Sequence, residues 1–136
     1  MSEIRTTIVF TTASSREEGD RIASALVEEH LAACVNLVPV ASVYRWQGAV
    51  ERADEVLLVI KTRRALVPRL GARVRALHSY QLPEVVAVPI AAGSRQYLSW
   101  LVAETRGAAR PRRRATRPVR RGAPTGTASP RRRSRP

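Results

Sequence analysis

The side chains best suited to chemistry in this chain are a single lysine and one short polar loop. Lys61 is the only lysine among 24 basic residues. Lysine and arginine differ in geometry and hydration, so either a confined position requires an ammonium there or the lysine stands by chance. His78 opens the loop 78–84, where its ring nitrogens, the phenol of Tyr80 and the carboxylate of Glu84 can converge. This group favours proton exchange or the binding of a small anion; alternatively, His78 only ends a helix, where the dipole favours it.

Motifs for tightly held metals and for covalent catalysis are absent from the sequence. His30 and His78 are the only histidines, and no Cys-x-x-Cys or His-x-x-x-His spacing occurs, which argues against a closed zinc site. Cys34 is the single cysteine and lies in an apolar segment, so we expect a buried, inert thiol. No glycine-rich phosphate loop or Ser-His-Asp set is present. The adjacent acids Asp54-Glu55 and Glu28-Glu29 are expected on the solvated surface.

Two aromatic residues indicate an interaction surface. Residues 31–62 contain three extended segments, and the middle one carries Tyr44 and Trp46 two positions apart. This spacing places both rings on one face of a strand. The chain has only six aromatic residues, and leaving two of them in water is costly. We therefore expect Tyr44 and Trp46 to contact another surface.

The order of expected elements follows from apolar periodicity, capping residues and prolines. A first helix should begin at Ser14 or Ser15, which have capping-box spacing to Glu17 and Glu18. The expected strands are residues 4–12, 33–38 (stopped at Pro39), 40–50, a central strand 54–62, and 84–90. The first expected helix ends at His30. The second begins near Pro68 and runs to Leu77, and the third follows Ser94, which is its N-cap.

These elements predict an α+β fold. If residues 33–38 and 40–50 form one bent strand, the order becomes βαββαβ with an added C-terminal helix. This is the split arrangement of a ferredoxin-like sandwich with a long bent middle hairpin, with its helices on one side of the sheet. The chain length of 136 residues supports one such domain, which we place at residues 1–106.

The strong positive charge belongs to the C-terminal segment. Residues 107–136 hold eleven arginines and no acid, and subtracting eleven from the net charge of +13 leaves +2 for residues 1–106. Arg, Pro, Ala, Gly, Ser and Thr dominate this tail, so we expect it to be disordered. It could bind nucleic acid or another polyanion through charge alone. The alternative is an incidental extension of an arginine-rich chain, because no aromatic residue is interleaved for base stacking.

Two features of the sequence bear on the location of the protein in the cell. The N-terminal residues lack a basic stretch followed by a long apolar run, and a lone cysteine forms no internal disulfide. We therefore expect a cytoplasmic protein. No apolar run approaches the roughly 20 residues needed to cross a bilayer, so we expect no membrane partner.

Five blocks in order carry a family resemblance. They are Leu31-Ala-Ala-Cys-Val-Asn36, Tyr44-Arg-Trp-Gln-Gly48, Glu55 with Lys61-Thr62, His78-Ser-Tyr-Gln-Leu-Pro-Glu84 and Tyr97-Leu-Ser-Trp-Leu101. Together they resemble the CutA divalent-cation tolerance proteins over residues 4–104. The resemblance implies a subunit similar to the PII signalling proteins, assembled as a PII-like homotrimer through strands that pair between neighbours. It also implies a role in tolerance of copper or other divalent cations.

The resemblance also suggests site residues. Copper ligands in the family correspond to Thr11, Leu77 and His78, so only His78 remains as a metal candidate, for weak binding of Cu(II) or another divalent cation. Tyr44 and Trp46 become trimer-interface residues. The candidates for a ligand cleft between subunits are Trp46, Lys61, His78, Tyr80 and Glu84.

Three functions remain to be distinguished. The favoured one is a non-enzymatic homotrimer in divalent-cation tolerance, which binds metal ions or small anions between subunits and needs no other cofactor. The second is an enzyme in an intersubunit cleft, where His78 exchanges protons, Tyr80 donates a hydrogen bond and Lys61 holds an anionic substrate. The third is a polyanion-binding scaffold that displays three arginine-rich tails.

Overall fold

The computed structural model describes residues 5–108 and confirms the expected order of elements. They are β1 (Thr6–Ala13), α1 (Arg16–Glu28), β2 (Cys34–Trp46), β3 (Ala49–Arg63), a 3-10 turn (Arg64–Leu66), α2 (Val67–Leu77), β4 (Val86–Pro89) and α3 (Arg95–Glu104). This is a βαββαβ unit followed by one helix. From residue 109 onward, the tail predicted to be disordered lies outside the described residues. No helix within residues 5–108 is long and apolar enough to cross a membrane.

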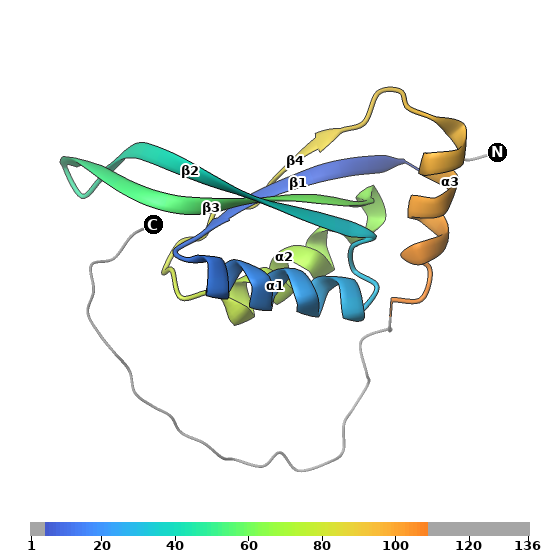
Figure 1. The fold of residues 1–136 in the computed structure, drawn as a ribbon, viewed down its shortest axis with the longest axis horizontal. Helices are drawn as coiled ribbons and strands as arrows, with labels where there is room; N and C mark the ends of the chain where they lie inside the picture. The colour runs from blue at the N-terminus through green and yellow to red at the C-terminus, as the bar shows by residue number, and fades with distance from the viewer. Residues whose placement is uncertain (1–4, 109–136) are drawn as a thin grey trace, which may run out of the picture.

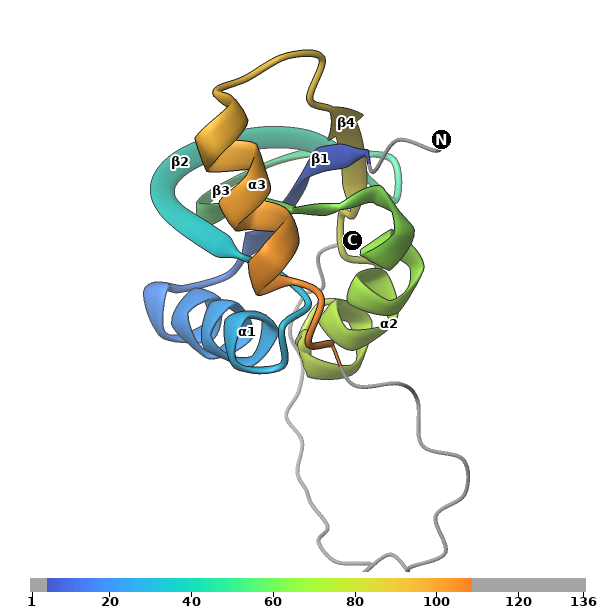
Figure 2. The same cartoon turned by 90° about the vertical axis from the view of Figure 1, so that its right-hand side faces the viewer.

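The four strands form one antiparallel sheet in the order β2-β3-β1-β4, with β3 in the interior as predicted. Helices α1 and α2 cover one face of the sheet, whereas α3 lies against the end where β1 begins and β3 ends (Figures 1 and 2). The core lies between the sheet and α1 and α2, and its large side chains are Val9, Ile22, Leu26, Leu58, Ile60, Leu70 and Val74. The expectation that all helices share one side therefore holds for α1 and α2 only.

Local sequence signals explain most helix ends. The hydroxyl of Ser15 accepts a hydrogen bond from the N–H of Glu18 at 3.0 Å, and Ser94 caps α3 in the same way. Pro68 lies in the first turn of α2, where its missing N–H costs nothing. The expected end of α1 at His30 was two residues too late, because His30 adopts a left-handed conformation (φ 61°) that ends the helix.

The middle hairpin differs from its predicted boundaries. Pro39 does not stop the strand, because β2 is an edge strand in which alternate N–H groups need no partner within the sheet. The expected strand 40–50 instead contains the turn of the hairpin. Gln47 (φ 52°) and Gly48 (φ 85°) form this turn, and Trp46 pairs with Ala49 across it. Two consecutive positive φ angles are typical of the tight turns that join antiparallel strands.

Two surfaces of the sheet are uncovered within the described chain. Strand β1 ends at Ala13 opposite Val56, so residues 40–55 extend beyond it as a two-stranded arm (Figure 1). The second surface is the sheet face away from α1 and α2, here called the open face. Strand pairing places apolar side chains along it: Ile8, Phe10, Val38, Leu57, Val59, Val86 and Val88. Val38, Val86 and Val88 are each at least 41% exposed.

Candidate functional site

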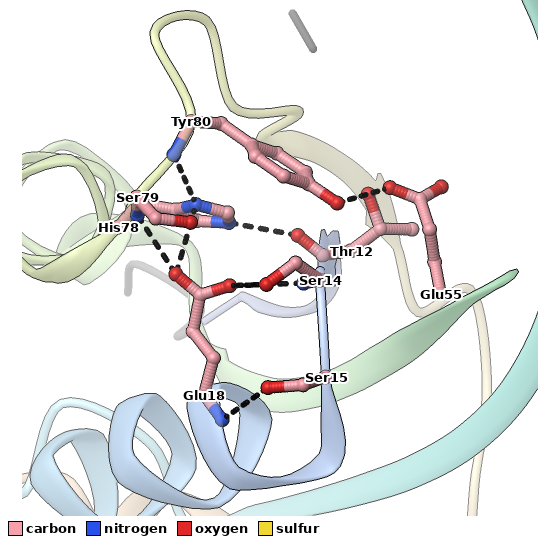
Figure 3. A network of polar contacts seen from close by, with 8 residues as sticks. All are labelled: Thr12, Ser14, Ser15, Glu18, Glu55, His78, Ser79 and Tyr80. Atoms are coloured by element: carbon pink, nitrogen blue, oxygen red, sulfur yellow. Dashed lines mark hydrogen bonds and ion pairs between the residues drawn. The ribbon is translucent and has the colours of Figure 1, made fainter. Parts of the chain in front are cut away.

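A network of polar residues joins the end of β1, the start of α1, the loop after α2 and, through Glu55, strand β3 (Figure 3). The turn between β1 and α1 contributes Ser14 and the cap Ser15, and the first turn of α1 contributes Glu18. The loop that follows α2 contributes His78, Ser79 and Tyr80. The residues of the network are Thr12, Ser14, Ser15, Glu18, Glu55, His78, Ser79 and Tyr80.

Glu18 links the β1–α1 turn to the loop after α2. Its Oε1 accepts hydrogen bonds from the N–H and the hydroxyl of Ser14, at 2.9 and 2.7 Å. Its Oε2 accepts one from the N–H of Ser79 at 2.7 Å. Burial by itself would raise the pKa of Glu18, but the hydrogen bonds from Ser14 and Ser79 outweigh it and lower the pKa. Glu18 is thus a buried carboxylate held in its charged form.

His78 uses both ring nitrogens inside the protein. Its side chain is fully buried. The Nε2 atom lies 2.7 Å from the carbonyl oxygen of Thr12, and Nδ1 lies 3.1 Å from the backbone N of Tyr80. A carbonyl can only accept and an N–H can only donate, so these two partners match a ring with a proton on Nε2, and Oε2 of Glu18 lies 3.6 Å from Nδ1. A metal ion could bind His78 only by displacing one of these partners.

Tyr80 continues the network to the sheet. Its ring lies beside that of His78, with centroids 4.6 Å apart, and its hydroxyl donates to Oε2 of Glu55 at 2.6 Å. The sequence placed Glu55 on the solvated surface, and this expectation was wrong, because Glu55 is only 4% exposed. Glu55 lies on β3 where the arm meets the rest of the sheet. The phenol therefore connects the loop after α2 to the base of the arm.

Lys61 occupies a second polar cluster at the other end of β3. Cys34 lies directly opposite it on β2, and the Lys61 ammonium donates to the side-chain oxygen of Asn36 and lies 3.8 Å from the sulfur of Cys34. Burial raises the pKa of Tyr97 on α3, and the neighbouring Cys34 adds to that shift. Cys34 is partly exposed and contacts a charged group, so the expectation of a fully buried thiol was wrong.

Within one chain, only two of the residues predicted for the ligand cleft, His78 and Tyr80, are in contact with each other. The rings of Tyr80 and His78 are in contact, and the Tyr80 hydroxyl is hydrogen-bonded to Glu55 on β3. Lys61 is six residues further along β3, about 20 Å at the usual rise of a strand. Glu55 pairs with Val40, and Trp46 is six residues along β2 in the opposite direction, again about 20 Å away. The other predicted cleft residue, Glu84, is exposed in the loop before β4.

The residues at the family's copper-ligand positions do not fit a copper site within one chain. Thr11 is fully buried, and Leu77 has no donor atom. His78 alone offers an imidazole, and both of its nitrogens are engaged. Within residues 5–108, no group of three or more His, Cys, Asp or Glu side chains is arranged to hold a metal ion. Copper(II) prefers several nitrogen donors, which this arrangement does not supply.

The long-range contacts of the polar network could not be predicted from the sequence. Sequence reasoning identified His78 and Tyr80 as a pair and noted the capping-box spacing of Ser15 and Glu18. It did not identify Glu18 as the acceptor for Ser79, because the two residues are 61 positions apart. The available signal for Glu55 was its position next to the apolar run that begins at Val56.

The fold and the network define a class: ferredoxin-like α+β proteins with an extended β2–β3 arm and an added C-terminal helix. Comparison with known proteins narrows this class. The sequence model for the family described as "CutA1 divalent ion tolerance protein" matches residues 7–104. The chain therefore belongs to the CutA1 family.

Individual relatives agree with this assignment. The divalent-cation tolerance protein CutA of Thermus thermophilus is 55% identical over 95 residues, which are 69% of this chain and 92% of the relative. The chloroplastic CutA of Arabidopsis thaliana is 49% identical over 73% of this chain, but the match spans only 55% of the plant protein. Among solved structures, CutA1 of T. thermophilus has a TM-score of 0.72 at 52% identity, covering 74% of this chain and 98% of the other. CutA1 of Oryza sativa has a TM-score of 0.73 at 45% identity, covering 75% and 94%.

Proposed function

We propose that this protein acts in tolerance to divalent metal ions, including copper, as a non-enzymatic homotrimer. The observation that carries the proposal is membership of the CutA1 family across residues 7–104, together with a relative named for divalent-cation tolerance that is 55% identical. The alternative of an enzyme that uses His78, Tyr80 and Lys61 is not favoured. The two ring nitrogens of His78 are engaged, the Tyr80 hydroxyl is bound by Glu55, and Lys61 lies near the far end of β3.

The uncovered surfaces support the assembly. The open face presents Val38, Val86 and Val88 to solvent, and the arm exposes Val43 and Val50, each more than half exposed. Contiguous apolar surface of this kind is typical of a protein interface. The outer edge of β2 also has no partner strand within residues 5–108. A long unpaired edge is available to pair with a strand from another subunit.

The same geometry supports a cleft between subunits. Trp46 lies about 20 Å along the arm from the strand position of Glu55, so it cannot contact the Tyr80–Glu55 pair of its own chain. In a closed trimer, the arm of one subunit reaches the surface of the next. We place Trp46 of one subunit beside the loop 78–84 of its neighbour. A small anion or a weakly held cation would bind there.

The location and the tail extend this proposal. We propose a cytoplasmic protein, for which the single cysteine is the supporting observation. Cell fractionation against a periplasmic marker would test this, and recovery with the marker would contradict it. The arginine-rich tail is proposed to add a salt-sensitive attraction to polyanions and to take no part in metal tolerance.

The test of function combines growth with assembly. Expression of this protein in a bacterial strain that lacks its own CutA should restore growth in inhibitory copper(II), whereas no gain in growth would contradict the proposed function. Trp46→Ala should shift the trimer–monomer equilibrium by about 2 kcal/mol per subunit in analytical ultracentrifugation, because a large aromatic contact is lost. Val27→Ala is the matched control, since Val27 is an exposed apolar residue of α1. A wild-type monomer at micromolar concentration would contradict the assembly.

A separate titration addresses copper directly. Calorimetry with copper(II) should give similar isotherms for the wild type and for His78→Asn, because the ring of His78 is committed to Thr12 and Tyr80. His30→Asn is the control, since His30 lies outside the network and its Nδ1 contacts the Glu104 carbonyl oxygen at 2.9 Å. Thermal unfolding of each variant checks that it is folded. A copper site lost only in folded His78→Asn would show that His78 is a ligand.

A further inference from the structure

Two adjoining hollows lie between α3, the loop that leads into it from β4, and the ends of β1 and β3. Figure 2 looks onto α3 and this loop. The first hollow has a volume of about 820 Å³ and the second about 690 Å³. Thr6, Ala92 and Leu98 line both of them, so they form one continuous depression, here called the α3 groove.

The floor of the α3 groove is apolar and closely packed. Leu98 lies at its centre, with Val102 on one side and Ile90 on the other. A Cβ atom added at Gly93 would come within 3.3 Å of the Leu98 side chain, so the loop backbone packs directly on that leucine. The N–H of Ile90 donates to the carbonyl of Thr6 at 3.1 Å, which holds the loop to β1. The floor is thus part of the fold and can receive an apolar group.

Among residues 5–108, the charged side chains at the rim of the α3 groove are all arginines. Arg95 and Arg106 line the first hollow and Arg5 and Arg64 line the second, and no Asp or Glu of the described residues lines either. None of these four arginines makes an ion pair with another residue of the described range 5–108. They are exposed, so their guanidinium groups are accessible. An apolar depression rimmed by four arginines selects for a ligand that carries both an anionic head and an apolar body.

Backbone and side-chain contacts bring these arginines together. The N–H of Arg64 donates to the carbonyl of Arg5 at 2.9 Å, which places the two residues side by side. Arg63 donates from Nε to the hydroxyl and from Nη2 to the carbonyl of Thr105, both at 2.9 Å, and so positions the adjacent Arg106. Burial lowers the pKa of Arg63, and the positive charges of Arg106 and Arg69 lower it further. Positive charge is therefore concentrated here although residues 1–106 are nearly neutral.

We propose that the α3 groove binds a small amphiphilic anion, with a phosphate-monoester or carboxylate head and an alkyl body. The guanidinium fork matches both heads, because each presents two oxygens for paired hydrogen bonds. The alkyl body lies on Leu98, Val102 and Ile90. The proposal does not depend on metal tolerance, since neither polar cluster contributes to the groove.

The experiment titrates octyl phosphate and octanoate, as monomers below their micellar concentrations, into the full-length protein labelled with ¹⁵N. Amide shifts are expected at Ala92, Gly93 and Leu98 for both probes. Inorganic phosphate tests the head alone, and the neutral octyl glucoside tests the alkyl chain alone. Each should bind at least tenfold more weakly than octyl phosphate, because each lacks one of the two contacts.

Two kinds of variant separate charge from shape. The double variant Arg64→Gln, Arg106→Gln should weaken octyl phosphate binding about tenfold, since exposed charge contacts are individually modest. Its control is Arg21→Gln, an exposed arginine of α1 far from the groove in sequence. Ala103→Phe fills the first hollow from an exposed position of α3 and should weaken binding to a similar extent without removing charge. Ser24→Phe on the exposed side of α1 is the control for adding an aromatic ring.

The possible outcomes are decisive. Loss of affinity in both groove variants, with both controls unchanged, would support the proposal. The proposal is overturned if octyl phosphate does not bind, if the neutral probe binds equally well, or if the shifts map to the arm or the open face. It is also overturned if the amide signals of the groove shift when the trimer dissociates but do not shift when the probes are added. The occupant of the groove is then a second copy of this chain.

Discussion

Glu18 is the residue on which the polar network depends most. It accepts three hydrogen bonds from two segments that are distant in sequence, and it does so as a buried carboxylate. A carboxylate that accepts several hydrogen bonds favours its charged form, which is why its pKa is lowered despite burial. Glu18 therefore connects protonation to the packing of the loop 78–84, which carries His78 and Tyr80.

Replacing Glu18 with Gln should destabilise the protein in a pH-dependent way. At pH 7 the free energy of unfolding should fall by about 2 kcal/mol, because a buried charged acceptor is lost. The folded-state pKa of Glu18 is lower than its ordinary 4.5, so its contribution is complete above about pH 4.5 and is lost as the pH falls through the folded value. The difference between wild type and Glu18→Gln should thus shrink in acid, as measured by urea unfolding at fixed protein concentration.

The matched control for this experiment is Glu28→Gln, an exposed carboxylate of the same helix. It should change the free energy of unfolding by less than about 0.5 kcal/mol, as is usual for exposed surface positions. A Glu18→Gln variant as stable as the control at pH 7 would show that the network contributes nothing. A constant difference between Glu18→Gln and wild type down to pH 3 would contradict the lowered pKa.

Lys61 is the only lysine in the sequence, and its ammonium donates to the side-chain oxygen of Asn36 and lies 3.8 Å from the sulfur of Cys34. A lysine presents a compact ammonium to these two neighbours, whereas an arginine would present a wider planar head. Its separation from His78 and Tyr80 could not be inferred from composition. It depends on the fold, which brings Tyr80 to Glu55, six residues away from Lys61 on β3.

Among the elements, the arm formed by β2 and β3 depends on two residues in a left-handed conformation. Gly48 has φ +85°, and a Cβ atom added there would have no heavy atom within 4 Å. Space is therefore available, but the backbone angle is unfavourable for other residues. Gln47 adopts φ 52° despite its side chain. Sequence reasoning placed an extended strand across this turn, because Gln-Gly is a weaker hairpin signal than Asn-Gly or Asp-Gly.

Substitutions at the turn should change stability in opposite directions. Gly48→Ala should cost about 1 kcal/mol, because the added Cβ strains a left-handed backbone without meeting any neighbour. Gln47→Asn should stabilise the turn by about 0.5 kcal/mol, since Asn adopts positive φ more readily. Both effects are read from the free energy of unfolding in urea. Destabilisation by Gln47→Asn, or tolerance of Gly48→Ala, would show that the arm does not keep this turn.

For the whole molecule, the net charge does not reveal where positive charge gathers in the folded domain. Eleven of the arginines lie in the tail, and residues 1–106 are nearly neutral at +2. Within those residues, folding still gathers Arg5, Arg64, Arg95 and Arg106 around one groove. Their positions along the chain span about a hundred residues, so the groove cannot be predicted from a local run of charged residues. The tail and the α3 groove are therefore separate candidates for anion binding.

Deletion of residues 109–136 should separate these two candidates. The shortened protein should keep the thermal stability and the assembly of the full chain, because the core formed by the described residues lies before the deletion. Binding to heparin in 50 mM salt should fall by at least tenfold, since the tail supplies the sequence-independent charge. Octyl phosphate binding should be unchanged. Heparin binding that survives the deletion would contradict the polyanion role of the tail.

Local sequence determined the elements of this protein and their class. The apolar run that begins at Val56, the caps Ser15 and Ser94, and the helical spacing after them act over a few residues, so they can be read without a structure. The order of these elements predicted the ferredoxin-like arrangement. The pair His78 and Tyr80 was also visible, because two residues apart in one loop they are necessarily close.

Only the tertiary structure decided which distant groups meet. Ser79 donates to Glu18 across 61 positions and Tyr80 donates to Glu55 across 25, and both contacts depend on strand register and on the path of the loop after α2. The same packing separated Lys61 from His78. The hydrophobic effect acts on any apolar face and leaves a periodic trace in sequence, whereas a hydrogen bond needs its two partners within about 3 Å, a condition that only the completed fold satisfies.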